Sequence, residues 1–146
     1  MFQTLPCLLV LTLGFTTGNN QVLDEFNYPS STEVRKNWQE LKGTLPLAMQ
    51  KSNDQNVLLL SAPFASNREI PRAGMDKSVK LDLTTPGVFS VDVKPEAPDS
   101  NHQVSLYFKS GPGWYSAARS VKGNNWQTLR FLKSDFRPED KPAGWN

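Results

Sequence analysis

The chain has 146 residues, a single cysteine, and a net charge of +2 at pH 7 from 16 basic and 14 acidic residues. This balance disfavours a nucleic-acid partner, because such binders carry a dense basic face that neutralises phosphates. The lone Cys7 lies in the apolar N-terminal stretch, so the rest of the chain has no disulfide, no thiolate nucleophile and no sulfur-based zinc site.

The first 18 residues resemble a secretory signal peptide. They carry no charged residue, they hold an apolar run from Leu5 to Phe15, and three small residues follow this run. The run is too short to span a membrane, which takes about 20 residues. We therefore expect residues 1–18 to be removed and residues 19–146 to form one domain of a secreted or periplasmic protein without a membrane span.

The segment after the predicted signal peptide favours a short edge strand followed by a short helix. Apolar and polar residues alternate in QVLDEFNYP, where the proline would end the strand. Ser30 and Glu33 then have the spacing of a helix capping box. One helix face would carry Val34, Trp38 and Leu41. We expect the helix to end near Gly43 and Trp38 to lie in the core.

Strand patterns replace the helical pattern after the predicted helix. A continuous apolar run at residues 56–64 is typical of a strand in a sandwich core. Residues 78–83 and 88–93 alternate apolar and polar side chains around a Pro–Gly turn, which predicts two sequential antiparallel strands. Their dry face would carry Val79, Leu81, Leu83, Phe89, Val91 and Val93. Asp82 and Asp92 would lie on the opposite, solvated face.

The most informative stretch, residues 104–145, predicts a three-stranded meander. Strand-like runs at 104–109, 114–121 and 126–132 are separated by the turn sequences SGPG and GNN. These three strands would lie side by side in one sheet, with one dry face and one exposed face.

Aromatic rings and cations of this meander are the candidate ligand-binding residues. They are Tyr107, Lys109, Trp114, Tyr115, Arg119, Trp126 and Arg130. Alternation sets the candidates of the third strand on the same exposed face as Tyr107 and Lys109, and we expect the middle strand to add Tyr115 and Arg119 to that face. Sugars present apolar C–H faces and hydroxyl edges, which suit flat rings and guanidinium groups. Ordinary packing between neighbouring strands is the competing interpretation.

The succession of these segments resembles galactose-binding-like jelly-roll domains, which occur as carbohydrate-binding modules attached to secreted bacterial glycoside hydrolases. The resemblance rests on the strand order and on three short motifs, LYF, GWY and WQTL. It implies an all-β, two-sheet antiparallel jelly-roll sandwich with one short N-terminal helix. It also implies a non-catalytic module that binds a polysaccharide or an oligosaccharide and is linked to an enzyme domain.

A structural calcium ion is a further implication of the resemblance. One of its carboxylates would come from the first strand, from Asp24 or Glu25. Such jelly rolls close with another apolar strand beside the first, and this sequence shows none before its last residue. We therefore expect a C-terminally truncated domain that lacks its final strand and leaves the first strand at an open sheet edge.

Three other functions compete with glycan binding. The same fold includes intermediate-associated domains that serve assembly, and here the aromatic side chains would pack against a neighbouring domain of a longer protein. A glycosidase needs two carboxylates, for which Asp82 and Asp92 are the candidates, although a solvated sheet surface also explains them. The sequence has no GxSxG, HExxH or P-loop motif, so we expect no enzyme activity. The charge and the signal peptide disfavour single-stranded nucleic acid.

Overall fold

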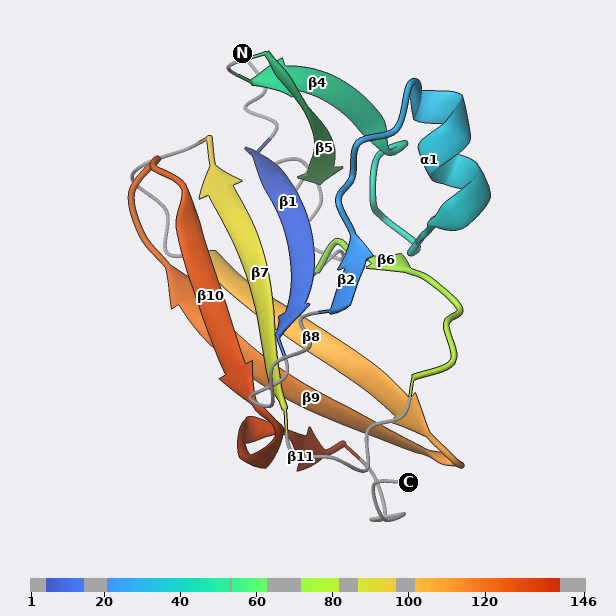
Figure 1. Ribbon diagram of the computed structural model, residues 1–146, viewed down its shortest axis with the longest axis vertical. Helices are drawn as coiled ribbons and strands as arrows, with labels where there is room; N and C mark the ends of the chain where they lie inside the picture. The colour runs from blue at the N-terminus through green and yellow to red at the C-terminus, as the bar shows by residue number, and fades with distance from the viewer. Residues whose placement is uncertain are drawn as a thin grey trace.

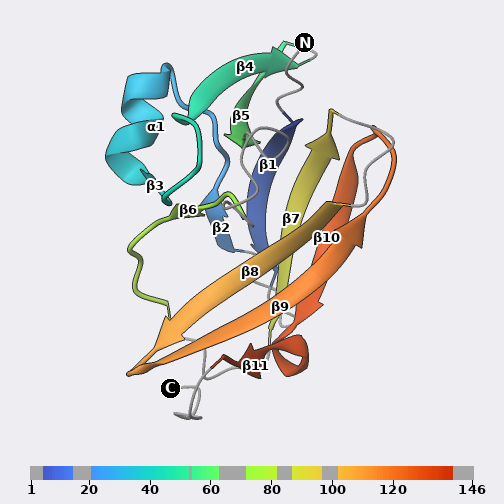
Figure 2. The same cartoon turned by 180° about the vertical axis from the view of Figure 1, so that it is seen from behind.

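The computed structural model describes residues 5–14, 21–52, 54–62, 72–81, 87–96 and 102–139. Within these residues two antiparallel sheets face each other, with a two-stranded ribbon and one α-helix at the side (Figures 1 and 2). The predicted all-β sandwich with one short helix is confirmed. The predicted cleavage after residue 18 falls outside the described residues.

The larger sheet has the strand order β10-β7-β1-β5-β4, and β2 also pairs with β1. Its strands are β1 (Leu5–Gly14), β2 (Gln21–Asp24), β4 (Ala48–Ser52), β5 (Gln55–Ala62), β7 (Val88–Pro95) and β10 (Gln127–Leu132). β2 pairs with residues 11–13 of β1, and among the described strands it has no partner on its other side, so it lies at a sheet edge. Residues 5–14, which belong to the predicted signal peptide, form the central strand.

The smaller sheet has the order β11-β9-β8, and it crosses over the larger one (Figure 2). Its strands are β8 (His102–Ser110), β9 (Gly113–Val121) and β11 (Arg137–Pro138), and the 3-10 helix η1 (Lys133–Asp135) precedes β11. The β8–β9 hairpin turns through residues 111 and 112, which lie between the paired residues Ser110 and Gly113. The first of them, Gly111, has a φ of 56°, a conformation that glycine adopts at little cost.

The predicted meander is wrong at its third strand. β10 pairs with β7 in the larger sheet, with Phe131 opposite Phe89, and it does not continue the β8–β9 hairpin. The chain crosses from one sheet to the other over residues 122–126. The alternation of β10 buries Leu129 and Phe131, and this pattern would suit either sheet, so it could not identify the partner strand.

The strand predicted at residues 78–83 differs from the structure where the structure describes it. Residues 78–81 do not form a strand, because β1 and β10 already occupy both sides of β7, their expected partner. Val79, which we expected on the dry face, is 43% exposed. Residues 82–86, with Asp82, lie outside the described residues.

The helix α1 (Ser31–Asn37) is shorter than predicted. Ser30 caps it by accepting a hydrogen bond from the backbone N–H of Glu33, as the sequence predicts. Trp38 then takes an extended backbone, with φ −125° and ψ 134°, and leads into the ribbon of β3 (Gln39–Glu40) and β6 (Met75–Asp76). Trp38 is 8% exposed, so its predicted place in the core is confirmed.

A cluster of four phenylalanines joins the two sheets. The ring centroid of Phe89 in β7 lies 4.7 Å from that of Phe108 in β8 and 5.4 Å from that of Phe136. Phe131 of β10 packs on Phe136 with a centroid distance of 6.3 Å. Burial of each such ring contributes about 1.5–3 kcal/mol to folding, so this cluster fixes the sheets against each other.

Candidate functional site

Three predicted ligand residues lie together on the outer side of the β8–β9 hairpin. Tyr107 is 41% exposed and Trp114 is 38% exposed, and the cross-strand partner of Trp114 is Lys109. We call Tyr107, Lys109 and Trp114 the hairpin face. The ammonium group of Lys109 lies 6.0 Å from the ring centroid of Trp114. Such a position over a ring face is weakly attractive.

Open hollows lie on both sides of the hairpin face, and Tyr107 and Trp114 line both of them. The first measures about 540 Å³ and contains polar side chains from distant parts of the chain, among them Arg72, Asp76, Gln103, Ser105 and Glu139. The guanidinium carbon of Arg72 lies 5.9 Å from the ring centroid of Tyr107. The second hollow measures about 560 Å³ and has a more apolar lining, which includes Met75, Val79 and Leu81.

The hairpin face therefore combines two exposed rings with hydrogen-bonding groups at their edges. Lys109 and Arg72 supply donors, the carboxylates of Asp76 and Glu139 supply acceptors, and Gln103 can do both. An extended ligand with apolar faces and hydroxyl edges could cover both rings and reach both hollows.

Trp126 belongs to a different surface. It lines an open groove of about 640 Å³ on the outer side of the larger sheet, which we call the Trp126 groove. The other residues along this groove are Glu25, Asn27, Lys51, Asp54, Gln55, Asn56, Val57, Asp92, Gln127 and Thr128. The hydroxyl of Thr128 donates to the carboxylate of Asp92, which lies on the outer face of β7 as predicted. The expected single face that Trp126 and Arg130 would share with Tyr107, Lys109, Tyr115 and Arg119 is thus wrong.

Tyr115 does not belong to any exposed face. It is 4% exposed and packs in the core together with Ala117 and Val121 of the same strand. Trp114 and Tyr115 are neighbours in a strand and must point to opposite sides, and the structure turns Trp114 outward. The prediction that Tyr115 projects to the ligand side is therefore wrong.

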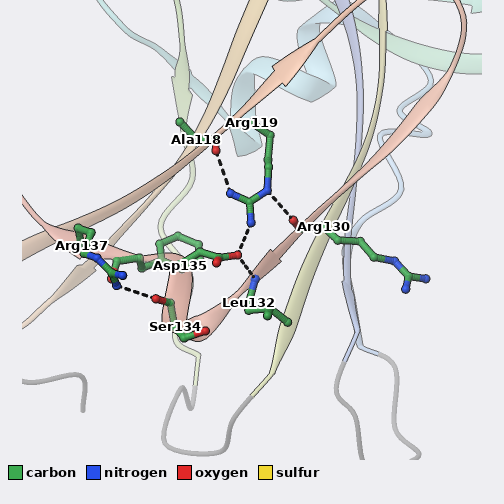
Figure 3. A network of polar contacts seen from close by, with 8 residues as sticks. Ala118, Arg119, Arg130, Leu132, Ser134, Asp135 and Arg137 are labelled. Atoms are coloured by element: carbon green, nitrogen blue, oxygen red, sulfur yellow. Dashed lines mark hydrogen bonds and ion pairs between the residues drawn. The ribbon is translucent and has the colours of Figure 1, made fainter.

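Arg119 is held by the protein itself (Figure 3). Its Nε donates to the carbonyl oxygen of Arg130 at 3.1 Å, its Nη1 donates to that of Ala118 at 3.0 Å, and its Nη2 pairs with the carboxylate of Asp135. The guanidinium carbon also lies 5.1 Å from the ring centroid of Phe131. Arg119 thus ties β9 to β10 and to η1, whereas the side chain of Arg130 extends away from this network (Figure 3).

This network predicts different effects for the two arginines. Arg119→Ala should lower the free energy of unfolding by about 1–2 kcal/mol, because three hydrogen bonds and the packing on Phe131 are lost from a half-buried position. Arg130→Ala should change it by less than about 0.5 kcal/mol. Urea denaturation of both variants measures the difference, and equal losses would contradict the structural role of Arg119.

Asp24, the first of the two predicted calcium ligands, accepts hydrogen bonds from the protein at both of its carboxylate oxygens. Asp24 is 8% exposed, and its Oδ1 accepts from the backbone N–H of Phe26 at 2.8 Å. Its Oδ2 accepts from the hydroxyl of Tyr28, from Nε1 of Trp38 at 2.8 Å and from Nζ of Lys77 at 2.7 Å. We call this set the Asp24 cluster. These four hydrogen bonds explain why a carboxylate is buried at this position without a metal ion.

Glu25 is exposed and lines the Trp126 groove. Among the residues that the structure describes, no group of three or more histidine, cysteine, aspartate or glutamate side chains is close enough to hold a metal ion. The structural calcium ion stays a prediction from the resemblance.

Comparisons with known proteins add no family to this picture. No family model, no curated protein and no solved structure matches the chain. Across the described ranges, no helix has both the length and the apolar character that crossing a bilayer requires. The assignment of function therefore depends on the residues of the two surfaces.

Sequence reasoning missed the polar residues that surround the hairpin face. Arg72, Asp76 and Glu139 come from segments without strand or helix periodicity, and only the fold brings them to Tyr107 and Trp114. Gln103 and Ser105 could have been found, because they alternate with Val104 and Leu106 and so share the outer face of β8 with Tyr107.

Proposed function

We propose that this chain is a secreted, non-catalytic carbohydrate-binding domain that binds an oligosaccharide or polysaccharide on the hairpin face. The observation that supports this most is the pair of exposed rings on neighbouring strands between two open hollows. The rings would stack on the apolar faces of sugar units. Arg72, Lys109 and Glu139 would form hydrogen bonds with their hydroxyl groups.

Affinity electrophoresis of the full chain against a panel of soluble polysaccharides tests the proposal. We expect at least one polysaccharide to retard the protein, and we expect Trp114→Ala and Tyr107→Ala each to weaken this binding tenfold or more, as loss of a central aromatic contact does. Trp126→Ala is the matched control, because Trp126 is also 38% exposed but lies on the other sheet.

The three variants separate the possible locations of a glycan site. Loss of retardation in Trp114→Ala with retention in Trp126→Ala places the glycan on the hairpin face. The reverse result would place it in the Trp126 groove. A folded protein that no polysaccharide retards would argue against carbohydrate binding altogether.

The second candidate is an assembly domain whose hairpin face packs against a neighbouring domain of a longer protein. The apolar hollow beside Tyr107 favours it, because Val79 is 43% exposed there and Met75 and Leu81 lie next to it. This candidate predicts no retardation by polysaccharides. It also predicts that Tyr107 and Trp114 become protected from solvent when the neighbouring domain is present.

A further inference from the structure

The central strand of the larger sheet consists of residues that resemble a signal peptide. β1 pairs with β7 along one edge, from Cys7 opposite Pro95 to Gly14 opposite Val88. Along its other edge it pairs first with β5, over residues 5–9, and then with β2, over residues 11–13. Figure 1 shows β1 between β7 on one side and β5 and β2 on the other.

Removal of residues 1–18 would therefore take away the shared partner of three strands. β7 would face β5 and β2 across the width of one missing strand, which is two strand spacings or about 9.6 Å. Each of these edges would present a row of unpaired backbone N–H and C=O groups. Strand β5 would also lose the pairing of Leu58, which lies opposite Leu9 and is fully buried in the complete chain.

We call the gap that β1 would leave between β7 and the pair β5 and β2 the slot, and the strands on its two sides are its walls. The residues of these walls determine which strand can fill the slot. Val91 and Val93 of β7 and Leu58 of β5 are fully buried on the inner side of the sheet. On the outer side, Asp92 of β7 and Val57 of β5 line the Trp126 groove. A strand that fills the slot must be extended, must run antiparallel to β5 and β7, and must place apolar residues on its inner side.

We propose that the space between β7 and the pair β5 and β2 is a strand-acceptor site. Its occupant is an extended apolar segment of the length and direction of β1, and residues 5–14 take this place in the unprocessed chain. When these residues are removed, the domain binds another apolar β-strand in the same slot. This inference goes beyond glycan binding and does not depend on it, because the walls of the slot are on the other sheet from the hairpin face.

Cleavage of the full chain between β1 and β2 tests the proposal. A protease site is placed at residues 15–20, the folded protein is cut, and residues 5–14 are then held only by non-covalent contacts. A peptide with the sequence of residues 4–15 and a solubilising lysine tail is the added ligand. We expect the melting temperature of the cut protein to rise with peptide concentration, as it does for any ligand that binds only the folded state.

The matched control is the same peptide with Leu8→Pro and Val10→Pro. Proline lacks the N–H group that a central strand needs, so this peptide should not raise the melting temperature. A second variant carries the sequence of residues 5–14 after Asn146 on a Gly/Ser linker, in a chain cut and purified in the same way. We expect it to keep the melting temperature of the uncut chain, because the slot then receives its strand from the other end.

Two results would overturn the proposal. One is a cut protein that releases residues 5–14 and still melts at the temperature of the uncut chain, since the slot would then need no strand. The other is an equal rise with the proline peptide, since binding would then reflect apolar contact without strand pairing. A cut protein that precipitates unless the unmodified peptide is present supports the proposal.

Discussion

Asp24→Ala should lower the free energy of unfolding by about 3–5 kcal/mol, one of the two largest single-residue effects that we expect in this protein. The carboxylate of Asp24 is the acceptor for all four donors of the Asp24 cluster. Alanine would leave the indole N–H of Trp38 and the ammonium group of Lys77 without this partner in a buried setting. Denaturation in urea measures the loss.

The backbone next to Asp24 adds to this cost. Phe26 is fully buried and has a φ of 50°, a left-handed conformation that is unfavourable for a residue with a Cβ. The hydrogen bond from its N–H to Asp24 holds this turn, and the ring of Phe26 packs on Trp38 with a centroid distance of 5.4 Å. Loss of the carboxylate would therefore loosen both the turn and the ring contact.

Glu25→Ala is the control for this prediction, because the neighbouring Glu25 is an exposed carboxylate. It should change the free energy of unfolding by less than about 0.5 kcal/mol. Similar losses in the two variants would show that Asp24 is not the centre of a buried cluster.

The same cluster predicts how stability depends on pH. Burial by itself opposes ionisation of Asp24, but the hydrogen bonds from Lys77, Tyr28, Phe26 and Trp38 outweigh it and hold its pKa below the ordinary value of 3.8. Burial and the hydrogen bond to Asp24 raise the pKa of Tyr28 to about 12. The stability that Asp24 contributes is complete above about pH 4 and is lost as the pH falls through its lowered pKa.

Tyr28 acts at the other end of the pH range. Its contribution is complete below about pH 10, the pKa of a tyrosine in the unfolded chain, and is lost as the pH rises towards 12. Melting temperatures from pH 2 to 12 should therefore show a plateau between about pH 4 and 10. The profile of Asp24→Ala should be flatter at both ends, and an unchanged profile would contradict the cluster.

Sequence patterns were sufficient to predict the buried face of a strand that has one apolar and one polar face. Phe89, Val91 and Val93 alternate with polar residues, and β7 buries these three as predicted. Ser30 also identified the start of α1 correctly. These predictions succeed because local chemistry alone decides them: a period of two sets the face of a strand, and a side-chain acceptor satisfies a helix N–H.

Long-range pairing was beyond the reach of the same patterns. β10 would bury Leu129 and Phe131 in either sheet, so nothing local states that it pairs with β7. Residues 78–81 alternate like a strand, but both edges of β7 are taken by β1 and β10. The partner of β10 decides whether Trp126 shares a face with Tyr107. The predicted single site is therefore divided between the hairpin face and the Trp126 groove.

The orientation of β9 could have been predicted from its turn. A two-residue loop at Gly111 and Pro112 pairs Ser110 with Gly113, and it must then pair Lys109 with Trp114. Since Lys109 points outward, Trp114 points outward as well, and Tyr115 points inward. The register of the hairpin thus carried information that the composition of the strand did not.

Substitution of the two neighbouring aromatic residues should therefore lower stability by very different amounts. Tyr115→Ala should lower the free energy of unfolding by about 3–5 kcal/mol, because it removes a ring that is 4% exposed and leaves a cavity in the core. Trp114→Ala should cost less than about 1 kcal/mol, because its ring is 38% exposed. Urea denaturation of the two variants in parallel measures both values.

Tyr115→Phe provides the control for Tyr115→Ala. It keeps the buried ring, so most of the stability should remain, and any loss reports on the hydroxyl group alone. A larger loss for Trp114→Ala than for Tyr115→Ala would mean that β9 is turned over and that Trp114 belongs to the core. In that case the ligand surface would have to include Tyr115, and the hairpin face would lose one of the two rings on which glycan binding depends.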